Sequence, residues 1–478
     1  MKGYCIYILV LATHTNCLEP CPKECYCPGW RIFQCDGNLM NITKFPVLEH
    51  LDVGNLIIIN TDISSLTSGE VILPFFPNLI AVALKFCNIR SINNLIFNAT
   101  REVERLDIAY NYLTSVPVQS FQVLTQLTIL DLSGNMITQV EAFSFSCCDK
   151  LRVIQLRENL IMNARYEATG GLVELQTLHM SNNVFESFPF PTENKSTFFV
   201  KSLYLASNNI LKLNVAVPTK FPTCSHLDLS SNYLIALDDY GLHGFPHLET
   251  LRAPRNNISF VGKSLFGDEP HGLQALVLHE NDIREIPSMI LTRLPNLTTL
   301  SLAKNNISNI HNFAFEHNSY LKYINLDENN IHTCSPLALV GLDNLDTLRI
   351  SFNKLSFLPI DFFQVNHDFG LNLRGNNWGC DCSIKFLYDW FKKTRFFRYP
   401  VDCNTPLELK GKNLLELELT DFCTDGNVST QSMATTTVLN NGITRQFVLQ
   451  TKSIIIVVMV SVMVVLVLCL FKWSIQNN

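Results

Sequence analysis

Leucine and other large apolar residues recur along most of this chain at spacings of two and three residues. A clear copy of the pattern L-x-x-L-x-L-x-x-N-x-L places Leu127, Leu130, Leu132, Asn135 and Ile137 at its positions 1, 4, 6, 9 and 11. Successive copies start 24 or 25 residues apart almost throughout. Self-similarity at such a period predicts a solenoid, in which each copy is one structural unit stacked on the next.

We count fourteen copies of this pattern. Twelve regular copies start at Leu79, Val103, Leu127, Leu151, Leu175, Val200, Cys224, Leu248, Leu273, Leu297, Leu321 and Leu345; a divergent copy starts at Leu48 and a final one at Asp368. From position 3 onward, apolar and polar residues alternate, which predicts a short strand with its leucines pointing inward. Stacked copies would form one parallel sheet over one continuous core. We therefore predict an α/β repeat solenoid over residues 48–378, shaped as a horseshoe with the sheet on its concave face.

Asparagine occupies position 9 in almost every copy. The twelve asparagines are Asn111, Asn135, Asn159, Asn183, Asn208, Asn232, Asn256, Asn281, Asn305, Asn329, Asn353 and Asn376, and Cys87 takes this position in the copy that starts at Leu79. The chain turns inward here, so the side chain must bond to backbone groups, and an amide can both donate and accept. We expect these residues to form a ladder of buried hydrogen bonds.

An aromatic residue recurs late in several copies. The residues are Phe97, Phe121, Phe145, Phe266, Phe315 and Phe363. A row of aromatic residues can form a ligand-binding box, but one ring per copy in the same register favours core packing. The pattern therefore predicts a phenylalanine spine on the convex side.

The start of the chain is typical of a secretory signal. Lys2 is followed by an apolar stretch from Tyr4 to Ala12, which is too short to span a bilayer. Cleavage after Thr15 or after Cys17 fits the preference for small residues, and we assign residues 1–16 to the signal. The mature chain is therefore expected outside the cell, where disulfides persist.

Two clusters of four cysteines flank the repeats. Cys21, Cys25, Cys27 and Cys35 lie in residues 17–47, and Cys380, Cys382, Cys403 and Cys423 lie in residues 379–423. Both open ends of a solenoid must be sealed against water. Four extracellular cysteines imply two disulfides, with three pairings for each cluster. A zinc site is the alternative, and the secretory start argues against it.

The two cysteine clusters resemble the flanking caps of extracellular leucine-rich-repeat proteins, the group that includes Slit, Toll-type receptors and the small leucine-rich proteoglycans. The run Asn376–Asn377–Trp378–Gly379–Cys380–Asp381–Cys382 is similar to the entry into their C-terminal cap. The resemblance covers residues 21 to 423. It implies the pairs Cys21–Cys27, Cys25–Cys35, Cys380–Cys403 and Cys382–Cys423.

Four further cysteines lie inside the repeats. Cys148, Cys224 and Cys334 fall on core positions, where we expect buried thiols. Cys147 falls on an outward position, and our one account of it is an additional bridge, with Cys17 as a candidate partner.

The C-terminal part of the chain has a different composition. Residues 424–452 are rich in Ser, Thr, Asn and Gln and predict a flexible stalk. Residues 453–471 include an uncharged run of 18 residues, about 27 Å long as a helix, which predicts a single transmembrane helix in the plasma membrane. The alternative is a glycolipid anchor attached near Asn440–Asn441–Gly442. We expect an extracellular N-terminus and a cytoplasmic tail of residues 472–478.

The remaining composition excludes several functions. Charged residues make up 16% of the chain and the net charge is −6, so no basic surface suggests nucleic acid. The twelve histidines lack metal-ligand spacing. Asp368–Phe369–Gly370 spells the metal-binding motif of protein kinases, but it opens the last repeat. Gly262–Lys263–Ser264 lacks the upstream glycine of a phosphate loop. We expect no enzymatic activity, no cofactor and no metal.

Seven N-x-S/T sequons predict a glycoprotein. They begin at Asn41, Asn98, Asn194, Asn257, Asn296, Asn306 and Asn427. Exposed sequons in a secreted chain are usually glycosylated, and a partner avoids such surface.

Strand side chains that point out of the core predict the binding face. The stripe at position 5 reads Asp52, Ala83, Asp107, Asp131, Gln155, His179, Tyr204, Asp228, Arg252, Val277, Ser301, Asn325, Arg349 and Asn372, and its N-terminal half is acidic. Fourteen strands at about 4.8 Å give about 60 Å, which suits a protein or a glycan chain. Two patches combine the Tyr and Arg that binding hot spots favour. One contains Arg152, Arg157, His179 and Tyr204, and the other Arg252, Arg255, His279 and Tyr323.

These features predict an adhesion or recognition receptor that binds an extracellular protein through its solenoid. The alternatives are a ligand-binding co-receptor of growth-factor or pattern-recognition type, which relies on a signalling partner in the membrane, and a matrix organiser. The sequence leaves the oligomeric state open.

Overall fold

The computed structural model describes residues 25–26, 32–36, 54–63, 78–98, 100–164, 171–189, 197–213, 221–363, 369–393 and 399–423. The chain divides into two units, Met1–Phe422 and Cys423–Asn478. The predicted signal, stalk, membrane segment and tail lie outside the described residues. Within the described ranges, no helix is long and apolar enough to cross a membrane.

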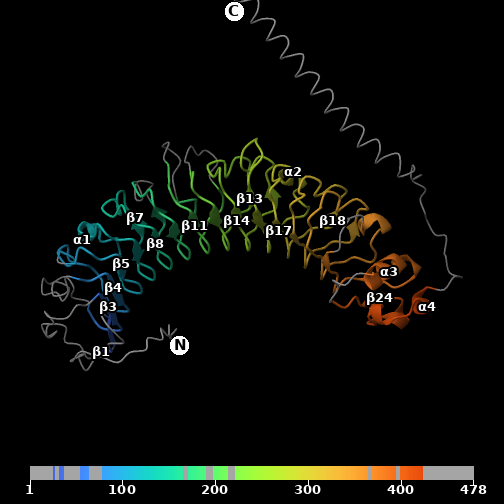
Figure 1. Ribbon diagram of the computed structural model, residues 1–478, viewed down its shortest axis with the longest axis horizontal. Helices are drawn as coiled ribbons and strands as arrows, with labels where there is room; N and C mark the ends of the chain where they lie inside the picture. The colour runs from blue at the N-terminus through green and yellow to red at the C-terminus, as the bar shows by residue number, and fades with distance from the viewer. Residues whose placement is uncertain are drawn as a thin grey trace, which may run out of the picture. The chain divides into compact units, whose positions relative to one another are not determined.

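One sheet of sixteen strands runs through the first unit, and its strands follow one another in chain order along an arc (Figure 1). The strands are β1 (Cys25–Tyr26), β2 (Ile32–Asp36), β3 (Asn55–Ile59), β4 (Ala81–Lys85), β5 (Arg105–Asp107), β6 (Ile129–Asp131), β8 (Val153–Gln155), β10 (Thr177–His179), β11 (Ser202–Tyr204), β12 (His226–Asp228), β14 (Thr250–Arg252), β16 (Ala275–Val277), β17 (Thr299–Ser301), β19 (Tyr323–Asn325), β21 (Thr347–Arg349) and β22 (Gly370–Asn372). β1 and β2 are antiparallel, and every later neighbouring pair is parallel.

The thirteen strands from β4 to β22 confirm the predicted register. Position 4 of each copy is buried in the core, and positions 3 and 5 point outward, as in β6, where only the central Leu130 is buried. Each strand is placed directly beside the equivalent residues of the next copy, for example Asp107 beside Asp131 and Asp131 beside Gln155. The apolar period of the sequence therefore sets the sheet.

The first, divergent copy has a different register from the predicted one. The start at Leu48 was wrong, because β3 pairs Ile57 with Ala83. Ile57 therefore replaces Asp52 in the outward stripe, and Leu56 and Ile58 point into the core with 0% and 1% exposure.

The reason for this shift is the absence of an asparagine at position 9 of the first copy. Two overlapping windows alternate apolar residues, and the sequence alone gave no polar marker between them. In the structure Thr61 takes position 9, is buried, and donates its hydroxyl to the carbonyl of Ile59. Stacking against β4 selects the window, since it places Ile58 beside Leu84.

The asparagine ladder is confirmed. The side-chain amide of Asn208 donates to the carbonyl of Met180 in the preceding copy (3.1 Å) and to that of Leu205 in its own (3.0 Å). Its oxygen accepts the backbone N–H of Phe185 at 3.2 Å. The other eleven asparagines repeat this pattern. Each rung therefore ties one copy to its neighbours.

The chain turns at position 8, where the backbone is left-handed in copy after copy. Residues with positive φ at this position are Asn60, Phe86, Tyr110, Gly134, Glu158, Asn182, Ser207, Ser231, Arg255, Glu280, Lys304, Glu328, Phe352 and Gly375. Most of them carry a Cβ, although glycine and asparagine favour this conformation. The interlocking asparagine ladder holds the turn, and the sequence gave no signal for it.

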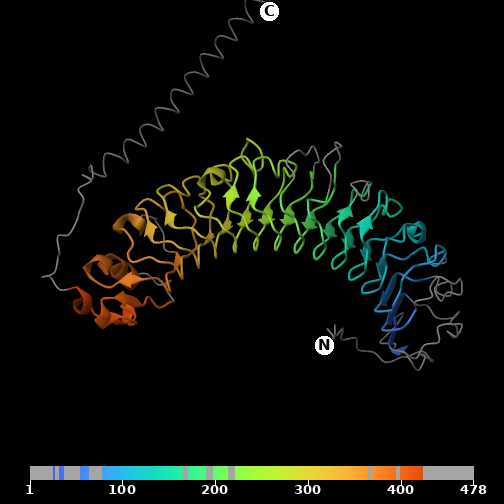
Figure 2. The ribbon, with the colours of Figure 1, turned by 180° about the vertical axis from the view of Figure 1, so that it is seen from behind.

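The convex side contains short pieces of structure rather than regular helices. Its ladders are β7 (Gln139–Val140) with β9 (Asn163–Ala164), β13 (Ala236–Leu237) with β15 (Phe260–Val261), and β18 (Asn309–Ile310) with β20 (Thr333–Cys334). Its helices are α1 (Val118–Phe121), α2 (Ser288–Leu291) and the 3-10 turn η4 (Ile360–Phe363). Figure 2 shows the same arc of strands and short convex segments from behind. Each connection is too short to propagate a helix, so the α part of the predicted α/β class is small.

The phenylalanine spine is confirmed in part. Five of the six predicted rings are buried: Phe97, Phe121, Phe145, Phe266 and Phe315. In the copy that starts at Leu345 the buried ring is Phe362, and the predicted Phe363 instead stacks on Trp390 of the C-terminal cap. The prediction missed Phe221 and Phe245, whose rings stack with centroids 4.4 Å apart.

The structure describes some of the cysteines of each predicted cap. At the N-terminal end, the β1–β2 register places Cys25 opposite Cys35, and Cys35 is disulfide-bonded; Cys21 and Cys27 lie outside the described residues. At the C-terminal end, a disulfide joins Cys380 and Cys403, with their Cα atoms 5.6 Å apart. Cys382 and Cys423 are also disulfide-bonded.

The C-terminal cap covers the last copy with apolar side chains. Its elements are β23 (Trp378–Gly379), η5 (Cys382–Ile384), α3 (Lys385–Lys393), β24 (Cys403–Thr405), η6 (Leu407–Leu409), η7 (Leu414–Glu416) and α4 (Leu419–Phe422). Trp378 is completely buried, and α3 packs Leu387, Tyr388 and Phe391 inward.

The internal thiols follow the prediction at three positions and depart from it at one. Cys148, Cys224 and Cys334 are free and buried. Cys147 is also free, so the additional bridge predicted for it is wrong. Its Sγ lies 3.1 Å from the Sγ of Cys148, which occupies the adjacent core position.

Candidate functional site

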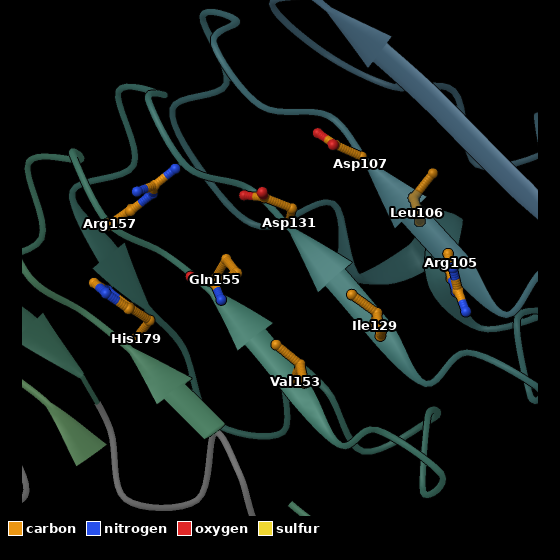
Figure 3. A pocket seen from close by; sticks show the side chains of 9 residues that line it. All are labelled: Arg105, Leu106, Asp107, Ile129, Asp131, Val153, Gln155, Arg157 and His179. Atoms are coloured by element: carbon orange, nitrogen blue, oxygen red, sulfur yellow. The ribbon is translucent and has the colours of Figure 1, made fainter. Parts of the chain in front are cut away.

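The outward face of the sheet contains a hollow of about 440 Å³. Its lining residues are Arg105, Leu106, Asp107, Ile129, Asp131, Val153, Gln155, Arg157 and His179. They come from the adjacent strands β5, β6, β8 and β10 and the turn after β8. Figure 3 shows Arg105, Ile129 and Val153 at the starts of the strands and Asp107, Asp131 and Gln155 at their ends. The hollow therefore has Arg105 and two apolar side chains at one side, and two carboxylates and an amide at the other.

Two carboxylates from neighbouring strands meet at the side formed by the strand ends. Asp107 forms an ion pair with Lys85, with 2.6 Å between Oδ2 and Nζ. Burial raises the pKa of Asp107, the charge of Lys85 opposes that shift, and the charge of Asp131 adds to it. Asp131 accepts the backbone N–H of Ser133 at 2.9 Å and has no ion pair within the described ranges. The hollow thus contains one carboxylate whose charge is not balanced by a direct partner.

The structure brings together three of the four residues of the first predicted patch. The rings of His179 and Tyr204 stack across β10 and β11, with centroids 5.0 Å apart. Burial lowers the pKa of His179, and the nearby positive charge of Arg157 lowers it further. Arg157 itself lies 4.0 Å from Glu158, at the limit of an ion pair. Arg157 and His179 line one edge of the hollow, and Tyr204 stacks on His179 from the next strand.

Arg152 does not belong to this group. It precedes β8, at the opposite end of the strand from Arg157, and forms an ion pair with Glu174 at 3.1 Å. Both side chains are about half exposed. Sequence spacing grouped the two arginines, but the extended strand between them separates them.

The second predicted patch is divided, and its arginines already have partners. Arg252 lies 3.8 Å from Asp228, and Arg255 lies 3.1 Å from Glu280. His279 lies beside them, and burial lowers its pKa. Tyr323 is three strands further along the sheet, about 14 Å away, and it interacts with Arg349. This patch offers fewer free groups than the first.

An aromatic pair beside the hollow was missed by the sequence reasoning. Phe86 and Tyr110 occupy position 8 in neighbouring copies, and their rings stack with centroids 4.7 Å apart and planes 5° apart. Phe86 is 49% exposed. Tyr110 belongs to the copy that supplies Asp107. The recurrence of aromatic residues at position 8, three residues after the stripe, was the available signal.

The described sequons lie away from the outward stripe. Asn98, Asn257, Asn296 and Asn306 are exposed, and none occupies a position in the sheet. Asn257 and Asn306 directly follow ladder asparagines, on the flank of the solenoid. Asn41, Asn194 and Asn427 lie outside the described residues. Glycans at the four described positions would leave the hollow accessible.

The hollow has the groups for recognition of a ligand. It combines apolar surface, two carboxylates, two guanidinium groups, an amide and an imidazole, each presented by a strand or by the turn that follows it. In the part of the chain that the structure describes, no group of three or more His, Cys, Asp or Glu could hold a metal ion.

Comparison with known proteins agrees with the fold. The family model described as "Leucine rich repeat" matches residues 77–137, 125–185, 200–258, 246–307 and 295–355, together more than half of the chain. Human "Leucine-rich repeats and immunoglobulin-like domains protein 1" is 30% identical over 163 residues, which are 34% of this chain and 15% of that protein. "Trophoblast glycoprotein" of Macaca fascicularis is 24% identical over 225 residues, 43% of this chain and 49% of that protein.

These matches cover less than half of each relative. Among solved structures, that of the Toll–Spatzle complex of Drosophila is similar with a TM-score of 0.57 and 19% identity, covering 80% of this chain and 60% of that chain. At this identity the likeness concerns the fold. The repeated motif, the stacked parallel strands and the family model agree, and the chain belongs to the leucine-rich repeat family.

Proposed function

We propose that this protein is a cell-surface recognition receptor that binds an extracellular protein through the outward face of its sheet. The observation that carries the proposal is the hollow between β5 and β10, with the stacked His179 and Tyr204 and the incompletely paired Arg157 at its edge. Tyr and Arg are the residues that most often dominate binding at protein interfaces.

The size of this face, and the position of the described sequons outside it, support a protein partner. The strands β4 to β22 form a continuous surface about 60 Å long at about 4.8 Å per strand, and the described sequons lie outside it. Such a length exceeds what a drug-sized ligand contacts. Toll, which has a similar fold, is found in a complex with Spatzle.

Attachment to the plasma membrane is part of the proposal. It rests on the apolar segment 453–471 and the secretory start of the sequence. Treatment of expressing cells with a phosphatidylinositol-specific phospholipase tests the anchor. Retention on the cells supports a transmembrane helix, and release supports the glycolipid.

The recognition role can be tested with the full-length chain expressed on cultured cells. Proximity labelling identifies the extracellular proteins that it binds, and Tyr204→Ala should reduce their capture about tenfold or more, the size expected for a hot-spot residue. Tyr233→Ala is the matched control, because Tyr233 is 54% exposed on the flank next to a ladder asparagine. Equal capture by both variants would exclude the outward face.

The same cells separate adhesion from a co-receptor role. Aggregation of expressing cells supports adhesion, whereas capture of a soluble protein without aggregation supports a co-receptor that relies on a signalling partner. Recovery of the chain mainly from the matrix would instead support a matrix organiser.

A further inference from the structure

We propose that the hollow between β5 and β10 binds a single basic side chain, Lys or Arg, of a protein ligand, with Asp131 as the residue that receives its positive charge. This inference rests on the proposed function and specifies the chemistry of the partner. It follows from the charge balance of the stripe, the shape of the hollow and the residues at its rim.

The charge balance distinguishes Asp131 from the other aspartates of the stripe. Asp107 is paired with Lys85 at 2.6 Å, and Asp228 lies 3.8 Å from Arg252. Within the described ranges, no cation lies within 4 Å of Asp131, and its one hydrogen bond is from the backbone N–H of Ser133. That bond engages Oδ1, and the side chain of Asp131 is partly exposed. A charge-assisted bond to a ligand cation is the strongest interaction this carboxylate can make.

The shape of the hollow suits a long side chain with a terminal charge. Ile129 and Val153 lie side by side at the starts of β6 and β8 and are both partly exposed. They precede Asp131 and Gln155 by two residues, about 7 Å along a strand. The aliphatic stem of Lys or Arg can cover this apolar surface while its charged head reaches the carboxylate. Gln155 adds an amide oxygen beside it.

The surrounding charges limit the ligand to one basic residue. Arg105 and Arg157 stand at opposite sides of the hollow (Figure 3), so a cation is attracted only where it lies against Asp131, and a run of several cations is repelled. Asp131 and Asp107 likewise repel a polyanionic glycan. A protein segment with an isolated Lys or Arg experiences the least repulsion, because its single charge can lie against Asp131, and an acidic residue next to it would face Arg157.

The stacked pair Phe86–Tyr110 supplies apolar contact next to the charged site. The two rings are parallel, and Phe86 is 49% exposed. A rigid aromatic surface beside a desolvated charge pair is the usual composition of a binding hot spot. We therefore expect an apolar residue of the ligand near the basic one.

The test uses purified full-length chain and a phage library of disulfide-cyclised peptides. Peptides selected on the wild-type chain should share one Lys or Arg. Asp131→Asn keeps the bond from Ser133 and the side-chain shape, and should weaken these peptides about tenfold or more, as loss of a charge-assisted hydrogen bond predicts. Replacing the shared basic residue of the peptide by norleucine should weaken binding to the wild-type chain to the same extent. The modified peptide should then bind the wild-type chain and Asp131→Asn with equal affinity.

Asp228→Asn is the matched control, because this aspartate of the same stripe already has Arg252 beside it. It should change the peptide affinities by less than about twofold, a few tenths of a kcal/mol. Equal unfolding midpoints of the three proteins exclude a folding defect. Selected peptides without a basic residue, peptides that bind elsewhere, or affinities unchanged by Asp131→Asn would each overturn the proposal. A preference for acidic peptides would assign the hollow to Arg157 instead.

Failure of this inference is distinguishable from failure of the proposed function. If Tyr204→Ala abolishes capture of the cell-surface partner and Asp131→Asn does not, the receptor role stands and the basic side chain does not. If neither change affects capture, both are wrong.

Discussion

The ring of Tyr110 lies flat against the backbone of Gly134, in the next copy of the repeat. A Cβ at Gly134 would lie 2.7 Å from Cε1 of Tyr110, closer than real Cβ contacts. Gly134 also has a φ of +64°, a conformation that residues with a Cβ rarely adopt. The Phe86–Tyr110 stack can therefore continue over this copy because no side chain is present there.

Gly134→Ala should destabilise the protein by about 1–3 kcal/mol, from backbone strain and overlap with the ring. In a Tyr110→Ala background the loss should shrink to the strain alone, about 1 kcal/mol. Urea unfolding of the wild type, the two single variants and the double variant measures the coupling energy between Gly134 and Tyr110. Gly272→Ala is the control, because no atom lies near a Cβ built there. Additive effects would show that the ring does not depend on Gly134.

The adjacent pair Asn208 and Asn209 offers a direct test of the ladder. Asn208 is 3% exposed and makes the three backbone bonds of its rung, whereas Asn209 is exposed. Asn208→Ala should cost about 3 kcal/mol or more, because two carbonyls and an N–H lose their buried partners. Asn209→Ala should change the stability by less than about 0.5 kcal/mol. Similar losses in chemical denaturation would contradict the ladder's structural role.

Stability should fall as the pH is lowered through the range below 6.5, in part because of His271. This histidine is 7% exposed, stacks on Phe266, and contacts the carbonyl of Phe245 through Nε2. Burial lowers its pKa from the ordinary value of 6.5. Protons therefore bind the unfolded chain first, so the free energy of unfolding decreases as the pH falls below 6.5 and levels off below the folded pKa.

Unfolding free energies between pH 5 and pH 7.5 check this expectation. His271→Gln should show a shallower decline than the wild type. A residual slope should remain, since burial also lowers the pKa values of His179 and His279. Parallel curves for the two proteins would assign the pH dependence to other groups.

The free thiols should differ in reactivity. A hydrogen bond with the Cys148 thiol lowers the pKa of Cys147, which is partly exposed. Burial raises the pKa of Cys87 to about 11 and that of Cys224 to about 12. Because the thiolate is the reactive form, N-ethylmaleimide should modify Cys147 in the folded protein and the buried thiols after denaturation alone. Peptide mass mapping gives the order, and early modification of Cys224 would contradict it.

The sequence determined the repeats because each core residue contacts the equivalent residue of the neighbouring copy. A leucine at position 4 faces the leucine one copy away, so one motif predicts Leu130 beside Leu106 and Ile154 throughout the stack. The asparagine ladder follows from the same regularity. Where the marker was missing, at Thr61, the predicted register failed.

The sequence could not determine which side chains on the face pair with one another. Arg152 and Arg157 look equivalent in the chain, but an ion pair with Glu174 occupies one and the hollow contains the other. These pairings depend on side-chain directions across two or three copies, which a one-dimensional pattern does not contain.

Periodicity alone therefore gave the solenoid, its core and the stripe of outward positions, since burial of apolar surface repeats with the motif. Only the tertiary structure decided that Asp131 has no ion pair among the described residues and that Tyr110 packs over Gly134. Both depend on what each copy places beside its neighbour, and there the copies differ.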